Sequence, residues 1–173
     1  MRRAILALAG VFALAGALAA CHGPAKPDPA KLSQANAEAQ AFMAKTAAEP
    51  GVQKLPSGLM FKVVRSGEPT GMRPQLGDEV KVNYEGKLAN GKVFDSSYER
   101  GQPAAMPLKG LIPAWQEALP LMRPGDEWIL YVPPNLGYGA EGAGGGEIPP
   151  NAVLIFKIEL LGVLPGPGRV ANG

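Results

Sequence analysis

Apolar and polar residues alternate along several short segments of the chain, which is the pattern of β-strands that are buried on one face. In residues 80–85 every second position is apolar, ending at Tyr84. Alternation of the same period occurs in residues 128–132 and 154–160, and residues 59–65 are expected to form the first strand. We therefore expect strands in these segments, with Tyr84 directed into the protein core.

A hairpin is predicted where two such strands are joined by Asn90 and Gly91. Both residue types tolerate a positive φ, so the pair favours a two-residue type I′ turn. The returning strand carries Phe94 and Asp95, and the turn is expected to bring them close to Tyr84. A carboxylate among large apolar side chains needs hydrogen-bond partners, which a neighbouring phenol or hydroxyl group can supply.

Residues 112–119 have a helical pattern instead. Ile112, Trp115 and Leu119 share one face, and Pro113 lies in the first turn, where a helix tolerates proline. A single short helix that packs on an antiparallel sheet is an α+β arrangement. We therefore predict an α+β domain.

The first twenty residues have the features of a secretory signal. A basic start at Arg2 and Arg3 is followed by an uncharged run of alanine and leucine that is short for a membrane-spanning helix. Residues 18–21, Leu-Ala-Ala-Cys, resemble a bacterial lipobox, and Cys21 is the only cysteine of the chain. We expect Cys21 to be lipidated and to anchor the protein to a membrane. Ordinary cleavage, with an incidental thiol, is the alternative.

Five segments are therefore expected. A lipoprotein signal peptide in residues 1–20 precedes a proline-rich spacer in residues 21–30. Residues 31–50 are predicted to form a short helical arm, which either packs weakly on the domain or serves as a dimerising helix. Residues 51–164 form the main domain, and residues 165–173 form a flexible tail. We expect a monomer, and a dimer is the alternative.

Charge and composition exclude several kinds of chemistry. The chain has 17 Lys and Arg residues against 15 Asp and Glu residues, and Arg2 and Arg3 supply the excess. A neutral mature chain does not bind nucleic acid through general basic charge. Beyond Cys21 and His22 the sequence contains no cysteine and no histidine. This excludes a Ser-His-Asp triad, a thiolate nucleophile and a His- or Cys-based metal site in the domain, so we expect no cofactor and no metal.

Four separate segments together resemble an FKBP-type peptidyl-prolyl isomerase domain. They are residues 82–98, 111–115, 136–139 and 148–156, in the order that is typical of the family. The resemblance implies a curved antiparallel sheet of about five to six strands that wraps around one short helix, in agreement with the α+β prediction. The short helical arm and the lipoprotein signal relate the chain to the macrophage infectivity potentiator group.

The resemblance also implies which residues form the proline-binding site. The catalytic residues that it implies are Tyr84, Asp95 and Tyr138. The substrate-binding residues that it implies are Phe94, Arg100, Met106, Leu111, Ile112, Trp115, Ile148 and Phe156. In this arrangement Trp115 would be the floor of the pocket. The Ile112 N–H and the Tyr138 hydroxyl would bind substrate carbonyl groups.

The implied function is peptidyl-prolyl cis-trans isomerisation in proline-containing polypeptides of the bacterial envelope. Rotation about an X-Pro bond needs no stable covalent intermediate, which suits a domain without histidine or cysteine. A non-catalytic chaperone or binding module for proline-containing segments is one alternative, and a structural lipoprotein is another. The expected location is the periplasmic side of the outer membrane, and a soluble periplasmic or secreted protein is the alternative.

Overall fold

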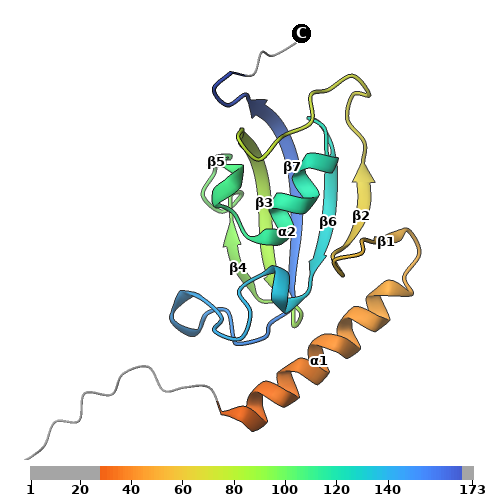
Figure 1. Cartoon of the computed structure of the whole chain (residues 1–173), viewed down its shortest axis with the longest axis vertical. Helices are drawn as coiled ribbons and strands as arrows, with labels where there is room; N and C mark the ends of the chain where they lie inside the picture. Colours follow the sequence, from red (N-terminus) through yellow and green to blue (C-terminus); the bar gives the residue numbers. More distant parts are fainter. Residues whose placement is uncertain (1–27, 169–173) are drawn as a thin grey trace, which may run out of the picture.

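The structure is a computed structural model that describes residues 28–168. The expected signal peptide, Cys21 and residues 169–173 lie outside the described residues. Figure 1 shows one sheet with a short helix, α2 (Pro113–Ala118), against one face and a longer helix, α1 (Pro29–Ala47), near one end of the strands. Within residues 28–168, no helix combines the length and the apolar character that crossing a membrane requires.

Seven antiparallel strands form the sheet in the order β1-β2-β6-β7-β3-β4, and β5 pairs with β3 beyond the end of β4. The strands are β1 (Val52–Lys54), β2 (Met60–Arg65), β3 (Glu79–Leu88), β4 (Val93–Ser96), β5 (Ala104–Pro107), β6 (Glu127–Val132) and β7 (Leu154–Leu164). Single turns of 3₁₀-helix occur at Leu108–Gly110, Leu119–Leu121, Pro134–Leu136 and Gly144–Gly146. The predicted α+β class is confirmed. The sheet has seven strands where about five to six were expected. The alternation of residues did not reveal β1 and β5, because both strands are too short for it to be recognised.

The core lies between α2 and the face of the sheet that α2 covers. The residues predicted to point inward from β3, β6 and β7 are all buried, and they are Val80, Val82, Tyr84, Trp128, Leu130, Val132, Leu154, Phe156, Ile158 and Leu160. Trp115, Ala118 and Leu119 meet them from the helical side. Burial of apolar surface contributes about 25 cal/mol per Å². This contact therefore holds α2 on the sheet and determines where Trp115 lies.

The hairpin between β3 and β4 differs from the prediction. Gly91 has a φ of 87°, whereas Asn90 is not among the described residues with a positive φ. The Gly91 N–H donates to the Leu88 carbonyl at 2.9 Å, and the Leu88 N–H donates to the Lys92 carbonyl at 2.9 Å. These bonds define a three-residue loop that ends on a left-handed glycine, and the predicted type I′ turn is wrong. The Asn90 side chain accepts from the Lys92 N–H at 3.0 Å and so stabilises the longer loop.

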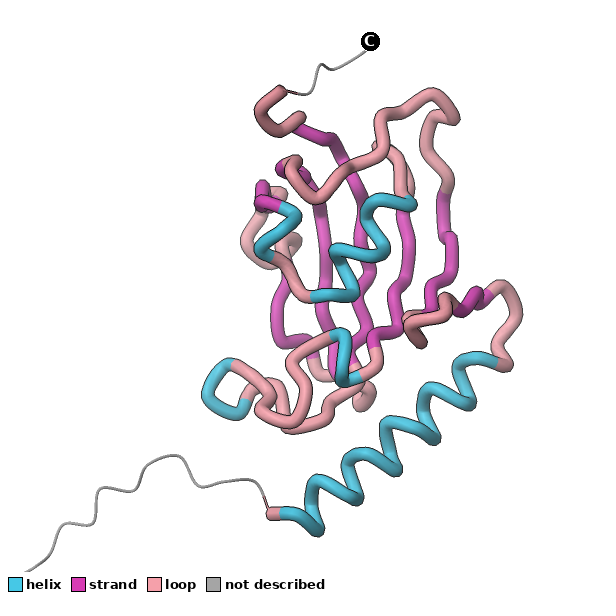
Figure 2. The backbone as a smooth tube through the Cα atoms, viewed as in Figure 1, coloured by secondary structure: helices cyan, strands magenta, loops and turns pink. Residues whose placement is uncertain are grey.

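Helix α1 begins after Asp28, whose side chain accepts a hydrogen bond from the Ala30 N–H at 2.9 Å. Most of the helix is exposed, but Ala39 and Thr46 are buried. Figure 2 shows α1 passing beside the long loop between β6 and β7, and residues of both line one groove. The helix therefore contacts the rest of the chain along a narrow strip.

Candidate functional site

A cavity of about 230 Å³ opens on the side of the sheet that carries α2. Its lining residues are Tyr84, Phe94, Asp95, Met106, Gly110, Leu111, Ile112, Trp115, Tyr138 and Phe156. All of them except Gly110 are residues that the sequence analysis assigned to the site. They come from β3, β4, β5, β7, the loop after β6 and the segment from the 3₁₀ turn after β5 to the start of α2.

Three pairs of aromatic rings form the apolar wall of the cavity. The Trp115 ring lies 5.2 Å from Tyr84 and 5.3 Å from Phe156, measured between ring centroids. Phe94 lies 5.6 Å from Phe156. All three pairs are nearly perpendicular, which is a favourable geometry for aromatic contacts. Trp115 and Phe156 are buried, so close packing holds this wall in a fixed position.

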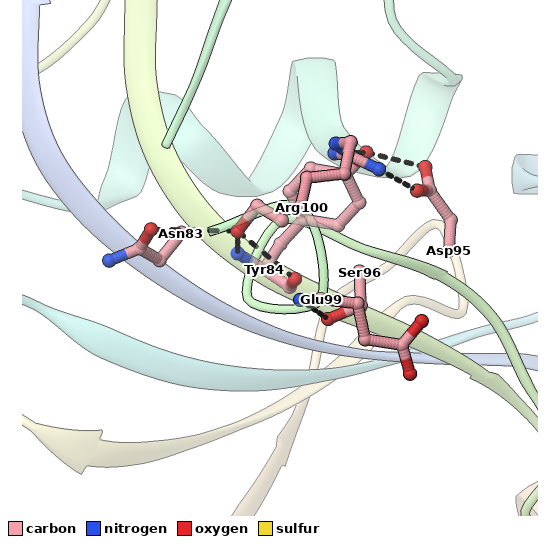
Figure 3. Close-up of polar contacts among 7 residues, drawn as sticks. Asn83, Tyr84, Asp95, Ser96, Glu99 and Arg100 are labelled. Carbon is pink, nitrogen blue, oxygen red and sulfur yellow. Dashed lines mark hydrogen bonds and ion pairs between the residues drawn. The ribbon is translucent and has the colours of Figure 1, made fainter. Parts of the chain in front are cut away.

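Figure 3 shows a polar cluster of Tyr84, Asp95 and Arg100. Tyr84 and Asp95 line one edge of the cavity. The Tyr84 hydroxyl donates to one oxygen of the Asp95 carboxylate, and the Arg100 guanidinium donates to the other oxygen. A second guanidinium nitrogen of Arg100 donates to the Tyr84 oxygen at 2.9 Å. The Asp95 carboxylate therefore has the hydrogen-bond partners that its position requires.

Asp95 is less enclosed than the sequence analysis expected. Its side chain is 40% exposed and that of Arg100 is 44% exposed. The reason is that β4 is the edge strand of the sheet and that Arg100, the ion-pair partner of Asp95, is exposed. The carboxylate thus lies at the mouth of the cavity and reaches both solvent and the apolar interior.

Ser97 fixes the backbone of Tyr84, and the sequence analysis did not identify it. The Tyr84 N–H donates to the Ser97 hydroxyl oxygen at 2.8 Å, and the Ser97 N–H donates to the Tyr84 carbonyl at 2.9 Å. Ser97 is completely buried. A buried hydroxyl that bonds the backbone of β3 holds the backbone of Tyr84 in place.

Gly86 is a second residue that the sequence analysis missed. A Cβ atom on Gly86 would lie 2.6 Å from the ring of Phe94 and 2.9 Å from the ring of Phe156. Such distances are below van der Waals contact, so a glycine is needed for both rings to pack over β3. A glycine inside an alternating strand signals such a close approach, and this signal was present in the sequence.

Burial raises the pKa of two tyrosines of the cavity above the usual value of 10.0. For Tyr84 burial is the largest cause, followed by the hydrogen bond to Asp95, while Arg100 acts in the opposite direction. For Tyr138 burial is again the largest cause, and the charge of Asp95 adds to it. Both phenols are therefore neutral hydrogen-bond donors at neutral pH.

The start of α2 forms the opposite rim of the cavity. Pro113 occupies the first turn of α2, as predicted, and Ile112 precedes it with an extended backbone. The Ile112 N–H makes no hydrogen bond to another residue of the described chain. The Gln116 side chain donates to the Leu111 carbonyl at 2.6 Å, which holds this rim against α2. Gln116 was not identified from the sequence.

Two of the assigned residues do not line the cavity. Arg100 reaches it indirectly, through Asp95 and Tyr84. Ile148 is buried in the core and forms an isolated bridge with Ala143, so it supports the loop that carries Tyr138. Among residues 28–168, no group of three or more His, Cys, Asp or Glu side chains could hold a metal ion.

Comparison with known proteins identifies the family. The profile of the FKBP-type peptidyl-prolyl cis-trans isomerases matches residues 71–161. The chain belongs to this family. The domain amino terminal to FKBP-type peptidyl-prolyl isomerases matches residues 19–63. The predicted resemblance is confirmed.

Individual relatives agree with this FKBP-type assignment. The peptidyl-prolyl cis-trans isomerase Mip of Coxiella burnetii is 55% identical over 129 residues, which cover 74% of this chain and 55% of the relative. The outer membrane protein MIP of Legionella longbeachae is 43% identical, with coverage of 77% and 56%. The crystal structure of FkpA from Escherichia coli has a TM-score of 0.74 at 41% identity, and the match covers 80% of this chain and 63% of that one. The chain spans little more than half the length of the two curated relatives. The matches to these relatives confirm the predicted relation to the Mip group.

Proposed function

We propose that the chain accelerates cis-trans isomerisation of X-Pro bonds in polypeptides and that the cavity lined by Trp115 and Tyr138 is the active site. The observation that carries this proposal is the combination of a rigid aromatic wall with a few neutral or charge-paired polar groups at its edges. Such a cavity fits the apolar ring of a proline and leaves the adjacent amide in contact with hydrogen-bond donors.

The proposed mechanism follows from the origin of the barrier to rotation about the X-Pro bond. Amide resonance sets a rotational barrier of about 18–20 kcal/mol, and water stabilises the planar, charge-separated form. Transfer of the amide into a dry aromatic cavity removes that stabilisation and favours the twisted state. Lowering the barrier by about 5 kcal/mol accelerates exchange by roughly 5000-fold, and no proton transfer is required.

Three groups would act on the substrate amide and its neighbours. The unpaired Ile112 N–H and the neutral Tyr138 hydroxyl would donate hydrogen bonds to substrate carbonyl groups. The Asp95 carboxylate, held by Tyr84 and Arg100, would act electrostatically near the carbonyl that twists. Trp115 would support the proline ring from below, with Phe94, Met106 and Phe156 around it.

The test is direct measurement of cis-trans exchange by NMR on a short proline peptide, with the chain from Gly23 onward as the catalyst. Exchange should accelerate in proportion to protein concentration, and Trp115→Ala in a still folded protein should remove most of the effect. Binding of the peptide without accelerated exchange would refute catalysis and support the chaperone or binding module.

We further propose that lipidation of Cys21 anchors the protein to the outer membrane and that the domain faces the periplasm. The lipobox-like residues 18–21 support this, as does the name of the Legionella relative, an outer membrane protein. Metabolic labelling with a fatty acid should mark the wild-type protein and not Cys21→Ser. Unlabelled wild-type protein would exclude the anchor and favour the soluble periplasmic or secreted form.

A further inference from the structure

The loop that carries Tyr138 has two sides, and only one of them faces the cavity. This loop, residues 133–153, connects β6 to β7. Its other side, which includes Gly139 and Asn151, lines a groove of about 570 Å³ against α1. Helix α1 therefore lies next to this side of the loop, and Figure 1 shows it running beside the loop at one end of the sheet.

Ala39 and Asn151 mark the place where the helix and the loop meet. A second groove, of about 420 Å³, also runs between α1 and the domain. Ala39 and Asn151 line both grooves, so they separate one groove from the other. Ala39 is 7% exposed and Asn151 is 9% exposed, although most of α1 is exposed. The helix thus crosses the loop at this pair of residues.

A backbone hydrogen bond of Asn151 connects this crossing point to the part of the loop that lines the cavity. The Asn151 N–H donates to the carbonyl of Gly139 at 2.8 Å, and Gly139 directly follows Tyr138. Asn151 has a φ of 56° and is the only described residue other than glycine in the left-handed region. Few residue types accept this conformation, so the local geometry depends closely on the residue at this position.

We propose that Asn151 is a positioning residue through which α1 determines where the Tyr138 hydroxyl lies in the cavity. A displacement of α1 at Ala39 shifts Asn151, and the hydrogen bond to Gly139 carries the shift to Tyr138. This inference rests on the proposed function, because the role of Tyr138 in substrate binding is part of it. It gives the helical arm a function in the activity of a single chain.

The experiment compares two substitutions on α1 in the purified full chain. Ala39→Leu adds bulk at the crossing point, where Ala39 is 7% exposed and a larger side chain displaces the helix relative to the loop. Ala41→Leu is the matched control, because Ala41 is exposed and lines neither groove. Each substitution is made in the wild-type chain and in Tyr138→Phe, and kcat/KM is measured by NMR exchange.

We expect Ala39→Leu to lower kcat/KM by about three- to ten-fold in the wild-type chain and by less than about two-fold in Tyr138→Phe. Ala41→Leu should have no effect in either chain. An equal loss in both backgrounds, or no loss from Ala39→Leu, would overturn the proposal. Asn151→Gly keeps the backbone conformation but removes the side chain beneath α1, so it should lower kcat/KM as Ala39→Leu does. This variant provides the test if Ala39→Leu does not fold.

A second measurement separates this proposal from the proposed function. In protein labelled with ¹³C-tyrosine, the ring signal of Tyr138 is assigned by its loss in Tyr138→Phe. Ala39→Leu should shift this signal and leave that of Tyr98 unchanged, whether or not the chain is an isomerase. An inactive wild-type chain would refute the proposed function alone, whereas an unmoved Tyr138 signal would refute the positioning role.

Discussion

At the scale of single residues, the shape of the cavity depends on positions that no functional motif marks. Gly86 leaves room for Phe94 and Phe156, and Ser97 holds the backbone of Tyr84. Neither residue carries reactive chemistry. Their contribution is geometric, because a cavity that excludes water requires rings at fixed distances.

Gly86→Ala should destabilise the fold by about 1–3 kcal/mol, because the new methyl group overlaps two rings, one of which, Phe156, is buried in the core. The same overlap should lower kcat/KM by about ten-fold or more. Denaturant unfolding and NMR exchange measure the two effects. Gly162→Ala is the control, since a Cβ atom there meets nothing within 4 Å and Gly162 also lies in a strand. Equal stability of the two variants would contradict the prediction.

Asp95→Ala should lower kcat/KM by about 10- to 100-fold, which corresponds to roughly 1.4–2.7 kcal/mol of transition-state stabilisation. The fold should survive, because the Asp95 side chain is 40% exposed. Glu99→Ala, at an exposed position nearby, should leave the rate unchanged. An unchanged rate in Asp95→Ala would show that the carboxylate has no part in the reaction.

At the scale of elements, the shape of the loop between β6 and β7 depends most on the backbone conformation of one residue, Asn151. Asn151 holds the left-handed conformation, and its N–H joins the last part of the loop to Gly139 in the first half. Asparagine and glycine accept this conformation more readily than alanine does.

Asn151→Ala should therefore destabilise the chain by about 1–2 kcal/mol, while Asn151→Gly should destabilise it less, because glycine reaches a positive φ without strain. Denaturant midpoints of the two variants test the difference. A glycine variant less stable than the alanine variant would show that the lost side-chain contacts outweigh the backbone conformation.

At the scale of the whole molecule, the dependence of activity on pH follows from the titrating groups of the described chain. Residues 28–168 contain no histidine and no cysteine, and burial raises the pKa of Tyr84 and of Tyr138 above 10.0. We therefore expect kcat/KM to be nearly constant between about pH 6 and 8.5. NMR exchange on a peptide without titrating groups measures this, and a sharp optimum inside the range would contradict it.

Stability should change at alkaline pH instead. A raised pKa means that the folded chain holds the two phenol protons more tightly than the unfolded chain does. Their contribution to stability is complete below about pH 10, the ordinary pKa of tyrosine, and is lost as the pH rises through the higher values of the folded state. Thermal unfolding across this range should show the decline, and replacing Tyr138 with phenylalanine should reduce it.

The chain from Gly23 onward should be a monomer. The larger apolar side chains of α1, Phe42 and Met43, already line grooves against the domain of the same chain. A stable dimer needs about 800 Å² of buried surface on each partner, and α1 offers few further large apolar side chains. Sedimentation velocity over a wide range of concentrations tests this, and a dimer at every concentration would contradict it.

The sequence by itself determined the elements whose residues repeat with a regular period. The alternation around Tyr84, the helical face of Trp115 and the position of Pro113 all reappear in the structure, because period and φ preference act within a few residues. The sequence also determined which side chains are available, including the absence of histidine from the domain. The family resemblance then led to nine of the ten residues that line the cavity.

Only the tertiary structure decided how far each of these residues is enclosed and what holds it in place. The exposure of Asp95 depends on β4 being the edge strand, and the crossing of Ala39 over Asn151 depends on the path of a loop that begins far from α1 in the chain. The turn at Gly91 depends on the register of β3 against β4. Contacts between distant segments result from strand pairing and packing, which no local pattern of residues encodes.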